Sequence, residues 1–330
     1  MSDACRLRRR AGPTLLLALY LFALPVFAEV PRDWLMRMAD AVEGLNYDGT
    51  LVHMHGGEAD ILRIVHRVQD GQVSERITAM DGAGREIIRN NDEVTCILPD
   101  QMAVHTEPRD DRDRSQSPLQ GRLPSIETLD EDLYTLSLTG SESVAGRAAR
   151  ILIVQPMDGY RYGYRLWLDD PTGMPLKTQL REASGGVLEQ LLFTDISMPA
   201  RIADADLQPS LDTTGFKQVR GMAVENGKEM PTAAWRAADV PSGFALLTVK
   251  SKYAPGADMP TEHLVYSDGL AWVSVFIEAG VAEDPAGGLS TMGAANAFTT
   301  SRDGHLITAV GDVPVRTVEL IALSTAPASP

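Results

Sequence analysis

The chain has 330 residues, of which 30 are Lys or Arg and 45 are Asp or Glu, so its formal net charge is −15 at pH 7. This acidic balance argues against nucleic-acid binding, which depends on neutralising phosphates with Lys and Arg, and against adsorption to an anionic membrane through bulk charge. It suits a basic protein partner and helps to keep an exported chain soluble.

The first 28 residues predict a secretory signal peptide, which we exclude from the fold. Arg6 and Arg8 to Arg10 form a positive start, and Leu15 to Leu24 form an apolar run too short to span a bilayer comfortably. Val26-Phe27-Ala28 predicts cleavage before Glu29, and an uncleaved anchor is the alternative. Removing residues 1–28 takes away four Arg and one Asp, which leaves 26 basic and 44 acidic side chains and a net charge of −18.

The chain has two cysteines, and only Cys96 remains after the expected cleavage. Because Cys5 lies near the chain start, before the apolar run, it does not fit a lipoprotein attachment signal. No intramolecular disulfide is then possible, so stability has to come from core burial, and about 300 residues are enough for two ordinary cores. Cys96 lies in the strand-like segment VTCIL and is predicted to be a small buried side chain, with intermolecular pairing as the alternative.

The mature chain is predicted to begin with a helix, because apolar residues from Trp34 to Leu45 recur at helical spacing. Asp33 is the expected N-cap, and Gly44 marks the end of the helix. Strands are predicted at 50–55, 61–68, 73–80, 86–90, 93–98 and 102–105, with Asp70-Gly71 as a two-residue hairpin turn. This part of the chain reads as a meander and contains no catalytic loop.

Residues 107–122 are rich in alternating charges and contain two prolines, so they predict a solvated loop, which could be a partner contact. A short helix is expected over 124–132. Strands resume at 133–138, 148–155, 162–168, 176–182 and 187–196, with a turn by composition at 169–173.

A stretch with little periodicity at 200–213 predicts a linker between a first domain at 29–199 and a second at 214–330, although the loop-like residues 220–231 allow a later boundary. The second domain is predicted to be mainly antiparallel sheet, with strands at 233–239, 244–253, 262–267, 270–278, 295–301 and 305–311. Hairpins are expected at Asp268-Gly269 and Asp303-Gly304. Residues 315–323 could close the domain as a helix or as a strand.

The sequence gives little support for a metal site or for catalysis. His53 and His55 share one face of a strand and His66 lies on the next, but a stable zinc site needs three or four ligands with supporting partners. No metal or cofactor is therefore predicted. No local nucleophile signature accompanies His105, His263 or His305, so the chain is predicted not to be an enzyme, and changing His53, His105 or Ser301 should remove no hydrolase activity.

An apolar ligand pocket has better support, because Met and aromatic side chains suit adaptable apolar sites. The candidate lining residues on the predicted helix and strands are Trp34, Met38, Met54, Met80, Met102, Tyr162, Tyr164 and Trp167. The alternative is that they are ordinary core residues. Five arginines of the meander, Arg63, Arg67, Arg76, Arg85 and Arg89, could meet the phosphates of a lipid headgroup, but cross-strand pairing with acidic residues such as Glu75 and Glu86 is the favoured interpretation.

Three separated blocks of the sequence resemble the RseB/MucB family of periplasmic regulators of an envelope-stress sigma factor. They are WLMRMADAVEGLNYDGTLVH near the mature start, HRVQDG with ERI, MDG and REIIR in the meander, and LVYSDGLAWVSVFIE at 264–278. The segment YRYGYRLWLDDPTGMPLKTQL also resembles the outer-membrane lipoprotein carrier fold. The resemblance implies an α+β chain with a carrier-like (LolA-like) open half-barrel and helix, followed by a smaller antiparallel domain.

The family resemblance implies a periplasmic binding protein that holds the periplasmic segment of a membrane anti-sigma factor and protects it from proteolysis. Lipopolysaccharide or lipoprotein acyl groups would release that segment. The hairpin at 264–278, with Tyr266, Trp272 and Phe276, is the expected partner surface, although these three residues could instead be core. A periplasmic lipoprotein or lipid carrier is the alternative, a periplasmic hydrolase is the weaker one, and a homodimer is plausible.

Overall fold

The structure is a computed structural model that describes residues 29–82, 84–90, 93–108, 119–124, 129–221, 233–252, 261–280 and 287–328. The expected signal peptide, most of the charged loop at 107–122 and the middle of the helix expected over 124–132 lie outside these residues. Residues 31–330 make up one structural unit and residues 1–30 another. The described chain is mostly β with two α-helices, and it contains one large open sheet and a separate antiparallel sheet.

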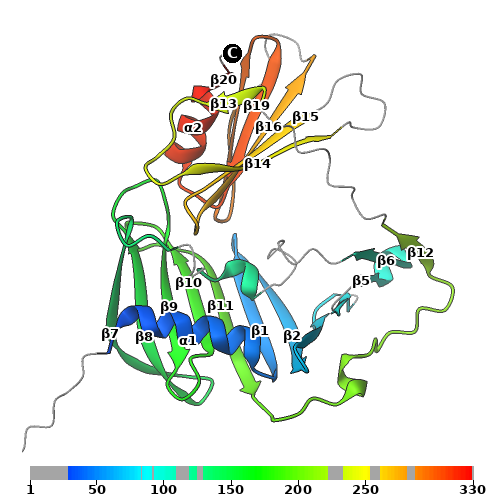
Figure 1. Cartoon of the computed structure of the whole chain (residues 1–330). Helices are drawn as coiled ribbons and strands as arrows, with labels where there is room; N and C mark the ends of the chain where they lie inside the picture. Colours follow the sequence, from blue (N-terminus) through cyan, green and yellow to red (C-terminus); the bar gives the residue numbers. More distant parts are fainter. Residues whose placement is uncertain are drawn as a thin grey trace, which may run out of the picture. The chain divides into compact units, whose positions relative to one another are not determined.

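The helix α1 (Pro31–Gly44) lies across the large sheet, as Figure 1 shows. Its buried face carries Trp34, Leu35 and Met38 and, further along, Ala41 and Val42, as the helical spacing predicts. The expectation that Asp33 is the N-cap is wrong, because the helix begins at Pro31. Proline is favoured at the first helical position, because the N–H that it lacks would have no partner within the helix. Asp33 lies in the first turn, where its carboxylate interacts favourably with the helix dipole.

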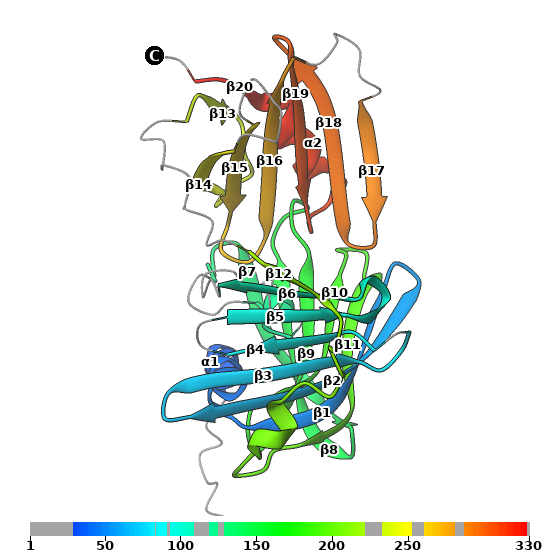
Figure 2. The ribbon, with the colours of Figure 1, turned by 90° about the vertical axis from the view of Figure 1, so that its right-hand side faces the viewer.

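The large sheet, which we call the first sheet, has twelve strands in the order β12-β6-β5-β4-β3-β2-β1-β11-β10-β9-β8-β7 (Figure 2). Its first half is formed by β1 (Tyr47–His55), β2 (Glu58–Gln69), β3 (Gln72–Ala79), β4 (Glu86–Arg89), β5 (Glu93–Leu98) and β6 (Ala103–Pro108). Its second half is formed by β7 (Tyr134–Val144), β8 (Arg147–Pro156), β9 (Gly163–Asp169), β10 (Pro175–Arg181) and β11 (Val187–Ser197). Antiparallel pairing of β1 with β11 joins the two halves.

The predicted meander is confirmed, since β1 to β6 pair with one another in chain order. Asp70 and Gly71 both have positive φ, of 53° and 75°, which is the geometry that a two-residue hairpin between right-twisted strands requires. The sheet is mixed because β12 (Lys217–Arg220) pairs with β6 in parallel. The first sheet therefore includes residues that follow the expected linker. The free edge of a sheet can pair with any extended segment, because main-chain hydrogen bonds do not depend on the side chains.

The second sheet has six antiparallel strands in the order β14-β15-β16-β19-β18-β17. They are β14 (Ala245–Lys252), β15 (Thr261–Ser267), β16 (Trp272–Ala279), β17 (Gly288–Met292), β18 (Ala295–Arg302) and β19 (His305–Gly311), and a small pair is formed by β13 (Trp235–Ala237) and β20 (Thr325–Pro327). The strand β17 was not predicted, because every one of its residues is exposed and it has no buried face to give a pattern. Residues 315–324 form the helix α2 (Val315–Ser324), which settles the choice left open by the sequence.

Each sheet has its own hydrophobic core. Beneath α1 the first core includes Leu51, Leu152, Leu166 and Phe193, all at most 1% exposed. The second core packs α2 through Val318 and Ile321 against Val273, Val275 and Ile307 of the second sheet. The predicted architecture, an open sheet with a helix followed by a smaller antiparallel sheet, is confirmed.

Candidate functional site

A cavity of about 450 Å³ is lined by residues of both sheets. The first sheet contributes Tyr162 and Tyr164 from its second half, together with Leu180, Glu189 and Leu191. The second sheet contributes Trp272 and the end of β19, which Asp312 follows. A volume of this size lies within the range of small-molecule sites and is large enough for an acyl chain segment or a few peptide side chains. The cavity is therefore the candidate binding site of the described chain.

The walls of the cavity are apolar with a few charged groups. Burial raises the pKa of Asp312, and the negative charge of Glu189 raises it further. Burial also acts to raise the pKa of Glu189, but the hydrogen bond with His53 and the charge of Arg122 outweigh it, so the pKa of this carboxyl is lowered. A ligand in this cavity thus meets an ionised carboxylate beside a guanidinium, surrounded by aromatic and aliphatic side chains.

The eight residues predicted to line an apolar pocket fall into three groups. Tyr162 and Tyr164 line the cavity. The other buried members, Trp34, Met38 and Trp167, lie in the core of the first sheet. The remaining three, Met54, Met80 and Met102, are 37–59% exposed on the outside of the sheet. The structure therefore brings two of the eight together at the cavity, and their ligand contacts stay predictions.

The three aromatic residues predicted to contact a partner also differ in position. Trp272 is 51% exposed and lines the cavity. Tyr266 is buried in the second core, where its hydroxyl accepts a hydrogen bond from the main-chain N–H of Ala237. Phe276 stacks on His263 with 4.4 Å between ring centroids. Of the three, Trp272 is the one that presents a large aromatic surface to solvent.

The hairpin expected at Asp268-Gly269 is present and connects Ser267 to Trp272. Ser267 pairs with Trp272, so the connection has four residues. The Asp268 carboxylate closes it by accepting hydrogen bonds from the main-chain N–H groups of Leu270 and Ala271. This loop places residues 269–272 at the cavity.

The arginines of the meander are mainly structural. Arg89 pairs with Glu75 at 2.7 Å and Arg76 pairs with Glu86 at 2.9 Å, as the favoured cross-strand interpretation predicted. Arg63 pairs with Asp48, and Arg67 pairs with Asp204. Because these guanidinium groups are committed to carboxylates, they do not form a free patch for phosphates.

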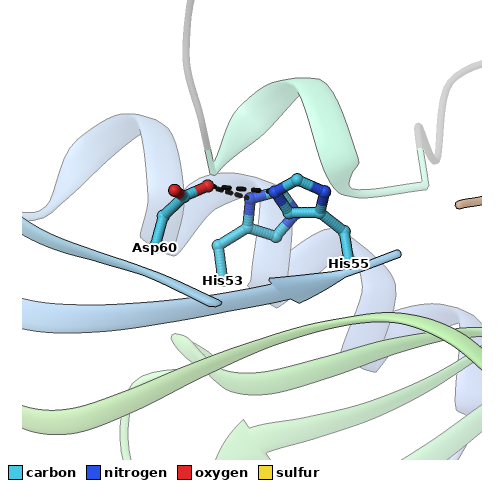
Figure 3. Close-up of side chains that lie close together, drawn as sticks. All are labelled: His53, His55 and Asp60. Atoms are coloured by element: carbon cyan, nitrogen blue, oxygen red, sulfur yellow. Dashed lines mark hydrogen bonds and ion pairs between the residues drawn. The ribbon is translucent and has the colours of Figure 1, made fainter. Parts of the chain in front are cut away.

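One cluster of potential metal ligands was missed from the sequence, although two of its members had been considered. The structure places Asp60 of β2 beside His53 and His55 of β1, so that three ligand atoms lie within 4.8 Å of one another (Figure 3). His66 lies elsewhere in the sheet, buried against Glu75 and stacked on Tyr47. The signal that could have found Asp60 is Gly56-Gly57, because a two-residue hairpin turn there fixes which residues of β1 and β2 face each other.

Within the described residues, no helix combines the length and the apolar character needed to cross a bilayer. The described chain thus consists of an open sheet and a second sheet, with a cavity lined by both. These features are typical of a binding protein.

The chain belongs to the MucB/RseB family. The model of the MucB/RseB N-terminal domain matches residues 30–211, and that of the MucB/RseB C-terminal domain matches residues 229–326. The sigma factor AlgU regulatory protein MucB of Pseudomonas aeruginosa is 36% identical over 96% of this chain and 98% of its own length. The sigma-E factor regulatory protein RseB of Escherichia coli is 26% identical over 87% of this chain and 88% of its own length. These relatives are regulatory proteins, and the prediction that the chain is not an enzyme agrees with them.

Solved structures extend the comparison to three dimensions. A crystal structure of MucB in complex with the periplasmic part of MucA is similar with a TM-score of 0.70 and 32% identity, covering 91% of this chain and all of that chain. A crystal structure of MucB alone is similar with a TM-score of 0.59 and 33% identity, covering 90% of this chain and 97% of that chain. The family predicted from the three sequence blocks is therefore confirmed.

Proposed function

We propose that this protein binds the periplasmic segment of a membrane-embedded anti-sigma factor and shields it from proteolysis until an envelope-damage signal releases it. The observation that carries the proposal is the similarity, over 91% of the chain, to MucB in its complex with the periplasmic part of MucA. Export to the periplasm after cleavage at Ala28 is part of the proposal, because the bound segment lies there.

Trp272 is the strongest candidate contact for the segment. Large aromatic side chains dominate binding energy at protein interfaces, particularly where they stand beside a pocket that excludes water. Trp272 fits this description, since it is half exposed and lines the cavity. An acidic chain with a net charge of −15 also favours a segment that carries basic residues.

Release by lipopolysaccharide or lipoprotein acyl groups would follow from competition. A lipid can shift the equilibrium between the complex and the free protein only by the difference between its affinity for the free protein and its affinity for the protein bound to the anti-sigma segment. The cavity offers apolar walls for an acyl chain, which both kinds of signal molecule carry. A lipid in the cavity would then weaken the binding of an anti-sigma segment that contacts the same walls.

The test is a calorimetric titration of the purified protein with a synthetic periplasmic segment of the cognate anti-sigma factor, repeated with lipopolysaccharide present. We expect tight binding that the lipid weakens, and at least a tenfold loss of affinity in Trp272→Ala, about 1.4 kcal/mol. Leu247→Ala is the matched control, because Leu247 is 55% exposed on the same sheet but does not line the cavity. Equal affinities for the two variants would remove Trp272 from the interface.

A periplasmic lipid or lipoprotein carrier is the second candidate, favoured by the cavity alone. A carrier would bind acyl chains without binding the anti-sigma segment. Absence of segment binding with or without lipid, together with saturable binding of a fluorescent fatty acid, would replace the regulatory proposal with the carrier.

A further inference from the structure

Two imidazoles and one carboxylate converge at the closed end of the β1–β2 hairpin. His55 Nε2 lies 3.0 Å from Asp60 Oδ2, and His53 Nδ1 lies 3.7 Å from the same oxygen. The two imidazole rings stack with 4.3 Å between their centroids, and both point toward Asp60 in Figure 3. One carboxylate oxygen thus faces a nitrogen of each ring.

The backbone fixes this arrangement. His53 and His55 are alternate residues of β1 and therefore project from the same face of the sheet. Asp60 is the direct cross-strand partner of His53 in the antiparallel pair. Gly56 and Gly57, with φ of 55° and 85°, form the two-residue turn that sets this register.

A second carboxylate fixes the orientation of one ring. Glu189 on β11 forms a short hydrogen bond with His53 Nε2, and Arg122 holds Glu189 from another side. An ionised carboxylate can only accept hydrogen bonds, so in the neutral imidazole Nε2 carries the proton and Nδ1 keeps its lone pair. That lone pair faces the Asp60 oxygen, which is also an acceptor. Two acceptors facing each other are unfavourable unless a proton or another cation lies between them.

The distances suit a transition-metal ion as that cation. With metal–ligand bonds of about 2.0–2.1 Å, tetrahedral coordination separates ligand atoms by about 3.4 Å. The observed 3.7 Å and 3.0 Å lie on either side of this value. The side chains of His55 and Asp60 are 37% and 49% exposed, so both can adjust, and a fourth position is open to water.

We propose that His53, His55 and Asp60 bind a divalent transition-metal ion of the zinc class, with Glu189 as the carboxylate that orients His53. Histidine ligands of zinc commonly donate their second ring N–H to a carboxylate in this way. Two imidazoles and one carboxylate with an open position are a recurring zinc ligand set. The proposal does not depend on the proposed regulatory function, although the metal site and the cavity share Glu189.

The experiment is a calorimetric titration of tag-free protein, stripped of metal with a chelator, with zinc chloride. We expect one zinc ion per chain. His53→Ala and His55→Ala should each weaken binding by more than about 100-fold, and Glu189→Gln by about 10- to 100-fold, the range for residues that orient metal ligands. Cobalt(II) should give the intense visible absorption of a tetrahedral nitrogen–oxygen site in wild type and lose it in Asp60→Asn, an isosteric change of a half-exposed side chain.

The controls separate this site from other zinc ligands. His305→Ala changes a half-buried histidine of β19 outside the cluster and should bind zinc as wild type does. Cys96→Ser tests the competing pair of Cys96 and His105, which face each other across β5 and β6. The proposal is overturned if wild type does not bind zinc, if the His53 and His55 variants bind it unchanged, or if Cys96→Ser removes it. Circular dichroism of each variant checks that loss of zinc does not simply report unfolding.

Discussion

Replacing Glu75 with Gln tests whether the buried ion pair of the meander is needed for stability. Glu75 on β3 and Arg89 on β4 are cross-strand partners, and Arg89 Nη1 donates to Glu75 Oε2 at 2.7 Å. Their side chains are 1% and 7% exposed, and His66 lies 3.5 Å from the other carboxylate oxygen. Glu75→Gln keeps the volume but leaves the Arg89 charge in the sheet without its counter-charge.

The expected cost is large because the remaining charge is buried. Removing one partner of a buried ion pair destabilises a protein by about 3–5 kcal/mol. The matched control is Asp48→Asn, which breaks the pair with Arg63 on the neighbouring strands β1 and β2. Those side chains are 28% and 45% exposed, so the expected cost is about 0–1 kcal/mol.

The assay is urea unfolding followed by circular dichroism at several pH values. Burial acts to raise the pKa of Glu75, but the interactions with His66 and Arg89 outweigh it and lower this pKa below its usual 4.5. A lowered folded-state pKa means that the ionised carboxylate stabilises the protein above about pH 4.5 and that this contribution is lost as the pH falls through the folded-state value. The difference between wild type and Glu75→Gln should therefore be largest at pH 7 and shrink in acid.

The buried ion pair is not needed for stability if Glu75→Gln lowers the free energy of unfolding at pH 7 by no more than Asp48→Asn does. If the difference between Glu75→Gln and wild type stays constant down to pH 3, the ionised carboxylate is not the source of the difference. A double variant, Glu75→Gln with Arg89→Leu, should recover much of the lost stability, since no buried charge remains.

Three further outcomes are expected. Gly311→Ala should destabilise the second sheet by more than about 2 kcal/mol in thermal unfolding, because its Cβ would lie 2.1 Å from a main-chain oxygen of β16, whereas Gly44→Ala, with open space, should not. Cys96 should react with iodoacetamide more slowly than free cysteine, and equally fast after unfolding, because burial raises the pKa of its thiol. Asp268→Asn should cost up to about 3–5 kcal/mol in urea unfolding, because the fully buried Arg161 guanidinium loses the carboxylate that it contacts at 2.7 Å and retains the one of Asp158 at 3.0 Å.

Much of the secondary structure could be predicted because its signals are local. The apolar spacing of α1 and the alternation in β1 to β5 depend on residues a few positions apart, and Asp70-Gly71 and Asp303-Gly304 each set a turn through positive φ. The parallel strand β12 and the exposed strand β17 escaped prediction, since neither has a buried face. The pairing of β12 depends on the free edge of a sheet that is complete only in the folded chain, whereas β17 pairs with its neighbour β18.

The sites could be predicted only in part. Tyr162 and Tyr164 were chosen as aromatic residues on a predicted strand, but Trp167 on the same strand and Trp34 on the predicted helix were chosen too, and both lie in the core. Composition does not distinguish the two tyrosines from the two tryptophans, because cavity walls and cores both accept large aromatic side chains. Whether such a side chain faces a filled core or a cavity depends on the residues that pack opposite it.

The sequence by itself determined the family, through three separated blocks, and the two-part architecture, through the periodicity of its strands. Only the tertiary structure brought Tyr164 and Trp272 to one cavity, and Glu189 to His53. The physical reason is the range of the interactions. Strand and turn propensities act between neighbours in the chain, whereas the pairing of β1 with β11 joins residues up to 149 positions apart, and the cavity is lined by residues of both sheets.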